Sequence, residues 1–214
     1  MSQVPEFSDI RNPLDEQKLA DYLDEMSLSL SQPDSQLPRF SKPYEIKQFT
    51  FGQSNPTYLV TDSLGAKYVL RRKPMPNSKL VSKSAHAIER EFFMLKGIAE
   101  CNKSVEKSRK VPVPEVFFLC EDESVLGVVF YMMDYVEGRS IKQPDLREIP
   151  ESQHMKYWES IMETIAAIHS VDCSKLIKFL PAKHFPQFQP ERLENRQNIP
   201  SYFERQIKTL TAVQ

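Results

Sequence analysis

The sequence contains little glycine, 5 residues in 214, whereas proline is frequent, with 16 residues. Few backbone positions can therefore adopt a positive φ, and many turns and element boundaries are fixed. An excess of charge of one sign is also lacking, because 28 lysines and arginines offset 29 aspartates and glutamates to a formal net charge of -1. This balance provides no global basic field, so neither nucleic acid nor an anionic membrane is an expected partner.

No apolar run is long enough for a membrane helix. The longest, from Val125 to Met133, falls far short of the ~20 residues that a span needs. The N-terminus contains Glu6, Asp9 and Asp15. It lacks the apolar stretch of a secretory signal and the arginine-rich, acid-free composition of a mitochondrial presequence. We therefore expect a cytoplasmic protein without a membrane span.

Cysteine is scarce, and its spacing does not fit the common cysteine sites. Cys101, Cys120 and Cys173 are odd in number and lack the paired spacing of a zinc site or a disulfide framework. Reduced structural thiols in a cytosol-like compartment are the simplest interpretation.

Residues 1–43 are predicted to form a leading helix and a linker. Asn12 and Pro13 supply a cap residue and an N1 proline. Apolar residues with helical spacing follow, namely Leu14, Leu19, Tyr22, Leu23 and Met26. From Ser27 to Pro43 the composition turns to serine, glutamine and proline, which is typical of a linker.

Residues 44–138 have the pattern of a five-stranded antiparallel sheet with one helix inserted after the third strand. In the helix, which Ser84 can cap, Ile88 and Phe92 mark the buried face, and Glu89 and Arg90 are expected to point outward. The strands are predicted at 44–51, 57–61, 67–71, 116–120 and 128–134, with a glycine turn at 62–65 between the second and third.

Residues 139–214 are predicted to be mainly helical, which makes the fold class α+β. Trp158, Ile161, Ile165 and Ile168 have the spacing of an amphipathic helix that ends near His169. A second helical pattern runs from about Ser201 to the end of the sequence.

The turn between the first two strands is a candidate phosphate loop. Gln53, Ser54 and Asn55 are small or polar and leave backbone N–H groups free to approach anionic oxygens. The full G-x-G-x-x-G pattern is absent, so an ordinary hairpin turn is the alternative.

Arg71 ends the third strand, the position from which a cation can neutralise phosphates and pair with an acid on the following helix. Helical spacing places Glu91 nearer the buried face than Glu89, so Glu91 is the predicted partner. Alternatively, Arg71, Arg72 and Lys73 form a solvated cluster at the edge of the sheet.

The end of the fifth strand has the character of a hinge. Met133, Asp134, Tyr135 and Val136 follow an apolar strand and could offer backbone N–H and C=O groups to the edge of an adenine. A plain exit from strand to loop explains the segment nearly as well.

Taken in order, six segments resemble the aminoglycoside phosphotransferase and choline kinase superfamily. They are GQSNPT (52–57), YVLRRKP (68–74), AHAIEREF (85–92), VPVP (111–114), LCEDESVLG (119–127) and YVEGR (135–139). The sequence is most similar to the subgroup found as the N-terminal domain of acyl-CoA dehydrogenase family members ten and eleven. Over about 44–210, the resemblance implies a protein-kinase-like N-lobe, 44–138, followed by an incomplete helical C-lobe, 139–214.

The resemblance also implies a function and roles for the candidate residues. In the subgroup, the domain is taken to phosphorylate the hydroxyl of 4-hydroxyacyl-CoA with Mg-ATP as donor. By resemblance, Arg71 contacts phosphate and Glu91 is its partner. Residues 53–55 form the phosphate loop, and 133–136 form the adenine hinge.

The sequence departs from the superfamily in its catalytic motifs. The superfamily has a His-Gly-Asp run followed by Asn, and later a metal-binding Asp in an Asp-Trp or Asp-Xaa-Asp motif. Neither motif occurs in the sequence. Without them phosphoryl transfer loses its base and its metal ligands. We therefore assign no catalytic or metal-binding residue, and His169 is interpreted as packing at a helix end. Mg²⁺ is expected only with the missing part of the C-lobe.

Three interpretations stay open at this point. In the first, the sequence is part of a phosphotransferase and is inactive by itself. In the second, it is a natural short pseudokinase-like module that binds nucleotide or protein. In the third, it is a domain that keeps the fold and binds no nucleotide. In the first two, the apolar faces of the last two helices would contact the missing C-lobe or a protein partner. Choline, an aminoglycoside or a sugar stays open as an alternative acceptor to a hydroxyacyl-CoA. By the same resemblance, a mitochondrial or peroxisomal location stays open beside a cytoplasmic one.

Overall fold

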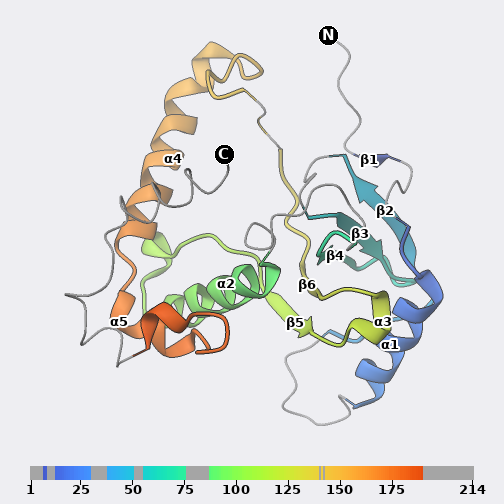
Figure 1. The fold of residues 1–214 in the computed structure, drawn as a ribbon. Helices are drawn as coiled ribbons and strands as arrows, with labels where there is room; N and C mark the ends of the chain where they lie inside the picture. Colours follow the sequence, from blue (N-terminus) through green and yellow to red (C-terminus); the bar gives the residue numbers. More distant parts are fainter. Residues whose placement is uncertain are drawn as a thin grey trace, which may run out of the picture. The chain divides into compact units, whose positions relative to one another are not determined.

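The computed structural model describes residues 7–8, 13–29, 38–50, 55–75, 87–139, 141 and 143–189. The chain divides into two compact units, Met1–Phe179 and Leu180–Gln214. The first unit contains the sheet and the helices that position the candidate site (Figure 1). None of the described helices has the length and apolar character needed to cross a membrane.

The sheet is antiparallel throughout and contains all five predicted strands. They are β2 (Glu45–Phe49), β3 (Thr57–Thr61), β4 (Lys67–Arg72), β5 (Val116–Cys120) and β6 (Phe130–Asp134). A two-residue strand that the sequence did not indicate, β1 (Phe7–Ser8), pairs with β2, and the spatial order is β1-β2-β3-β4-β6-β5. The α+β fold, with the five predicted strands in one antiparallel sheet and an inserted helix, is thus confirmed.

The predicted glycine turn joins β3 to β4. Gly65 has φ +83°, a conformation that costs glycine little. One carboxylate oxygen of Asp62 accepts hydrogen bonds from the amides of Leu64, at 2.9 Å, and Ala66, at 2.8 Å. The turn is therefore fixed by its own side chain as well as by the strands.

Helix α1 (Glu16–Ser29) covers one face of the sheet. Leu19 and Leu23 are fully buried and pack in a cluster with alternate residues of the central strands, including Tyr58, Leu70 and Met132. Each fully buried leucine contributes about 1.5–3 kcal/mol through removal from water. The helix predicted to lead the chain is therefore part of the sheet's hydrophobic core.

Helix α2 (Ile88–Asn102) is the predicted inserted helix, and it packs on the face of the sheet opposite α1. Ile88 and Phe92 join Val129 and Tyr131 in a second buried cluster. Its N-cap residue, Ala87, makes no side-chain cap, and the predicted cap, Ser84, lies outside the described residues.

Glu89 of α2 corrects one sequence expectation. It was expected to point outward, but it is buried, whereas Arg90 is exposed as expected. Glu89 forms an ion pair with Lys73, the residue that follows β4. This pairing allows a carboxylate to lie on the inner side of the first turn of the helix.

The predicted turn between β5 and β6 contains a short helix, α3 (Glu123–Leu126). Asp122 caps it by accepting from the Ser124 amide, and Gly127, at φ +77°, ends it. A single 3-10 turn, η1 (Lys107–Arg109), lies in the loop before β5.

The helical part begins with η2 (Glu151–Gln153) and α4 (His154–His169), which confirms the helix predicted to end near His169. The apolar side of α4 is largely exposed; Met155 and Met162 are 68% and 60% accessible. The second helical pattern, from about Ser201, lies outside the described residues.

Two further short elements complete the first unit, α5 (Cys173–Leu176) and η3 (Ile177–Phe179). Both contact α2, and Gly97 of α2 allows the close approach, since a Cβ there would lie 2.7 Å from Leu176 Cδ1. In the second unit, η4 (Pro186–Phe188) includes Phe188, whose ring stacks on Phe185.

Candidate functional site

A cavity of about 560 Å³ opens where β6 leaves the sheet. Val69 of β4 and Met133 of β6 face each other across the strand pair and both line it. The four predicted hinge residues all contribute to its wall. The full lining is Phe49, Val69, Pro112, Val113, Pro114, Met133, Asp134, Tyr135, Val136, Gly138 and Arg139.

The hinge backbone is only partly available to a ligand. The amide of Asp134 donates to the carbonyl of Glu115 at 2.8 Å, so this N–H is already used. The cavity is mostly apolar and has the exit of β6 along its wall, which is a suitable setting for a planar base. The adenine role of residues 133–136 stays a prediction.

Arg71 lies two residues beyond Val69 on β4, and therefore on the same face of the sheet. Its Nε lies 3.1 Å from Glu91 Oε2, and its Nη1 donates to Thr57 Oγ1 at 3.3 Å. The Nε–H is not aligned for a hydrogen bond, so its contact with Glu91 is electrostatic. The structure brings the predicted pair together, whereas the phosphate role of Arg71 stays a prediction.

Tyr131 completes this cluster, and sequence reasoning missed it. Its hydroxyl donates to Glu91 Oε1 at 2.8 Å, and the residue stands opposite Arg71 in the β4–β6 register. Burial and then the neighbouring Glu91 carboxylate raise the pKa of Tyr131 well above its ordinary value, so the hydroxyl keeps its proton. The alternation of β6 places Tyr131 on the same face as Met133, which is the signal that could have identified it.

Arg71, Arg72 and Lys73 do not form a solvated edge cluster, so that alternative is wrong. Arg72 is 1% exposed on the α1 face, where it donates to Tyr58 Oη at 3.1 Å and to the Pro13 carbonyl at 3.2 Å. The strand alternation sends successive cations to opposite faces.

The burial of the two glutamates also differs from the prediction. Glu89 is more buried than Glu91, contrary to the helical-spacing argument, because Lys73 neutralises it.

Of the predicted phosphate loop, only Asn55 is among the described residues; Gln53 and Ser54 lie outside them. Asn55 is buried next to the start of β3, and its carbonyl accepts from Thr57 Oγ1 at 3.0 Å. Thr57 therefore links the end of this loop to Arg71.

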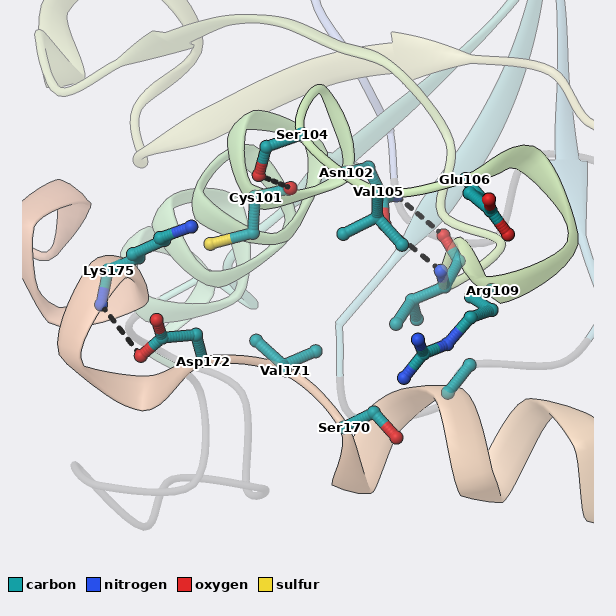
Figure 2. Close-up of a pocket in the computed structure, with 12 residues that line it drawn as sticks. Cys101, Asn102, Ser104, Val105, Glu106, Arg109, Ser170, Val171, Asp172 and Lys175 are labelled. Carbon is teal, nitrogen blue, oxygen red and sulfur yellow. Dashed lines mark hydrogen bonds between the residues drawn. The ribbon is translucent and has the colours of Figure 1, made fainter.

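A second cavity, of about 350 Å³, lies between the end of α2 and the segment joining α4 to α5. Figure 2 shows Cys101, Asp172 and Lys175 gathered at one end and Arg109 and Ser170 at the other. The sequence did not indicate it. No group of three His, Cys, Asp or Glu side chains that could hold a metal occurs in the described part of the chain.

Comparisons with known proteins agree with this geometry. The sequence matches the phosphotransferase enzyme family over residues 45–213. It is 41% identical over 130 residues to acyl-CoA dehydrogenase family member 10 of Mus musculus, covering 61% of this chain and 11% of that protein. It is 37% identical over 141 residues to a probable acyl-CoA dehydrogenase, IBR3, of Arabidopsis thaliana, covering 64% and 16%.

A solved structure, a putative aminoglycoside phosphotransferase from Ralstonia eutropha, has a similar fold, with a TM-score of 0.55 and 29% sequence identity. The match covers 77% of this chain and 40% of that one. The chain thus spans a small part of the two dehydrogenases and two fifths of the bacterial structure. The resemblance stated from the six sequence segments is confirmed.

Proposed function

The chain belongs to the phosphotransferase enzyme family, and from that premise we propose that it is the nucleotide-binding part of an ATP-dependent small-molecule phosphotransferase. One observation carries the proposal. The hinge cavity and the Arg71–Glu91 ion pair lie on the same face of β4, two residues apart along the strand. A base in the cavity would have its phosphates within reach of a fixed cation.

The residues present fit such a nucleotide. Val69 and Met133 supply apolar walls for a planar base, and Tyr135 and Val136 lie on the strand exit beside it. Within the described part of the chain, no ion pair or hydrogen bond uses Arg71 Nη2. A guanidinium held through its other two nitrogens can donate from this one to a phosphate oxygen.

We further propose that this chain by itself binds nucleotide without transferring phosphate. The sequence contains no His-Gly-Asp run with its following Asn, so the base and the Mg²⁺ ligands would have to come from a further part of the phosphotransferase fold. The exposed apolar side of α4 offers a surface for that part or for a protein partner.

The proposed acceptor in the complete enzyme is the hydroxyl of a hydroxyacyl-CoA. Support comes from relatives named as acyl-CoA dehydrogenases, which share up to 41% identity with this chain. Incubation of a full-length form with Mg-ATP and 4-hydroxyacyl-CoA, choline or an aminoglycoside should give a phosphorylated product with the acyl-CoA alone. Phosphorylation of either other acceptor would redirect the assignment.

Nucleotide binding is tested by ligand-dependent stability. A ligand present at 100 times its dissociation constant, and bound only by the folded state, adds ~2.7 kcal/mol. We expect ATP to raise the free energy of unfolding of the wild type and Arg71→Ala to abolish this increase. Lys107 is an exposed cation on η1, and Lys107→Ala should retain the increase. An unchanged shift in Arg71→Ala would disprove its role, and no shift with any nucleotide would favour a fold that has lost binding.

A natural short pseudokinase-like module is the second candidate, favoured by the same missing motifs. Intact mass or an immunoblot of the endogenous protein separates the two. A species near 24.9 kDa would support the module, and a much larger one would support the phosphotransferase.

A further inference from the structure

We propose that Tyr131 is a positioning residue of the nucleotide site, which holds Glu91 so that the guanidinium of Arg71 is presented in one orientation. This inference rests on the proposed function. Glu91 accepts from Tyr131 Oη through Oε1, at 2.8 Å, and pairs with Arg71 Nε through Oε2, at 3.1 Å. Both oxygens of one carboxylate are thus used, one toward β6 and one toward β4.

The ion pair needs such support because it is partly open to solvent. The side chains of Arg71 and Glu91 are 27% and 35% exposed. Pairs of this kind are screened by water and lose side-chain entropy when held in one geometry, so they fix little by themselves. A glutamate on the first turn of a helix can otherwise adopt several rotamers.

Tyr131 is the rigid member of the cluster. It is fully buried, and its ring packs against Phe92 of α2 with 5.8 Å between centroids. Its position opposite Arg71 in the β4–β6 register also fixes its backbone. The hydroxyl therefore occupies one place, set by the core, and Glu91 is oriented by it.

Orientation of Arg71 matters only for a ligand that carries phosphate. The hinge cavity is built from other residues, so adenosine would not sense the loss of the Tyr131 hydroxyl. ATP and ADP would, because a less ordered guanidinium must be ordered on binding. A general loosening of the fold would instead weaken all three ligands together.

Binding of ATP, ADP and adenosine to the full chain by calorimetry tests the inference with Tyr131→Phe. We expect ATP and ADP to bind about tenfold more weakly, the effect of losing ~1.4 kcal/mol, and adenosine to bind within about twofold of wild type. Tyr157→Phe in α4 is the matched control and should change none of them. Equal weakening of all three ligands, or of none, would overturn the proposal.

A second measurement keeps the inference testable if the proposed function fails. In that case the wild type binds no nucleotide, and NMR of the arginine Nε–H resonances reads the cluster directly. The Arg71 resonance, identified by its loss in Arg71→Lys, should shift and broaden in Tyr131→Phe and keep its position in Tyr157→Phe. An unmoved resonance would show that Tyr131 does not position the pair.

Discussion

Arg71 and Arg72 are neighbours in β4, yet their side chains lie on opposite faces of the sheet. Arg71 pairs with Glu91 on the α2 face, whereas Arg72 is 1% exposed beneath the N-terminal segment, with Tyr58 and the Pro13 carbonyl as partners. Identical side chains one residue apart therefore serve different ends. One belongs to the candidate site and the other to the fold.

Arg72→Ala should lower the free energy of unfolding by about 2–4 kcal/mol, because it removes buried hydrogen bonds and leaves a cavity. Arg71→Ala should cost about 1 kcal/mol or less, since its ion pair is partly exposed. Urea unfolding of both variants measures the difference, with Lys107→Ala as the exposed control. Equal losses at positions 71 and 72 would contradict the assignment of the two arginines to separate faces.

Gly65 should tolerate asparagine better than valine. A Cβ at this position meets no atom within 4 Å, so the whole cost comes from its backbone φ of +83°. Valine should lose about 1–2 kcal/mol of stability, and asparagine, which adopts this region more readily, clearly less. Thermal unfolding of the two variants checks the ranking, which a reversed order would refute.

The three thiols should differ in reactivity. Cys173 is exposed, whereas Cys101 and Cys120 are buried, and burial raises the pKa of the Cys101 thiol. A thiol reagent should modify Cys173 at once under native conditions and the other two on the order of 100-fold more slowly, after local opening. Peptide mapping of the labelled protein identifies the sites, and Cys173→Ser should remove the fast phase. Rapid labelling of Cys120 would show that the β5–β6 end of the core is open.

Asp172 should titrate below the ordinary value for an aspartate. The Ser174 hydroxyl donates to its Oδ1 at 2.6 Å and lowers the pKa of the carboxyl group below 3.8. A lowered folded-state pKa means that the carboxylate's contribution to stability is present at neutral pH. It is lost as the pH falls below 3.8 through the folded pKa. NMR titration of the Asp172 carboxyl carbon should show the low pKa, and Ser174→Ala should bring this pKa closer to 3.8. An unchanged pKa in that variant would exclude the Ser174 hydroxyl as the cause.

Elements with a strong local pattern could be predicted from the sequence. The five strands, the inserted helix and α4 all follow from apolar spacing and from turn residues such as Gly65. The pairing of Arg71 with Glu91 was also predicted, although the burial argument behind the choice of Glu91 was wrong, because Glu89 is the more buried of the two glutamates. These inferences needed only one element at a time, or two that are adjacent in the sequence.

Features that depend on distant segments could not be predicted in this way. The burial of Arg72 requires the segment at Pro13, 59 residues away in sequence, to cover the strand. The inward position of Glu89 depends on its ion pair with Lys73, the residue that follows β4. The spacing of residues within α2 gives no information about this lysine. The alternation of β6 indicates the face on which Tyr131 lies, but not the hydrogen bond from its hydroxyl to Glu91, which is 40 residues away in sequence.

The two-sided role of β4 has a consequence for genetic variation. The strand is paired with β3 on one edge and β6 on the other, so its length is fixed from both sides. If one codon between 67 and 70 were deleted and the preceding turn held its place, Arg71 would move into the buried position of Leu70. Alleles that shorten this strand by one codon should therefore be lost more readily than alleles that substitute any one of its residues.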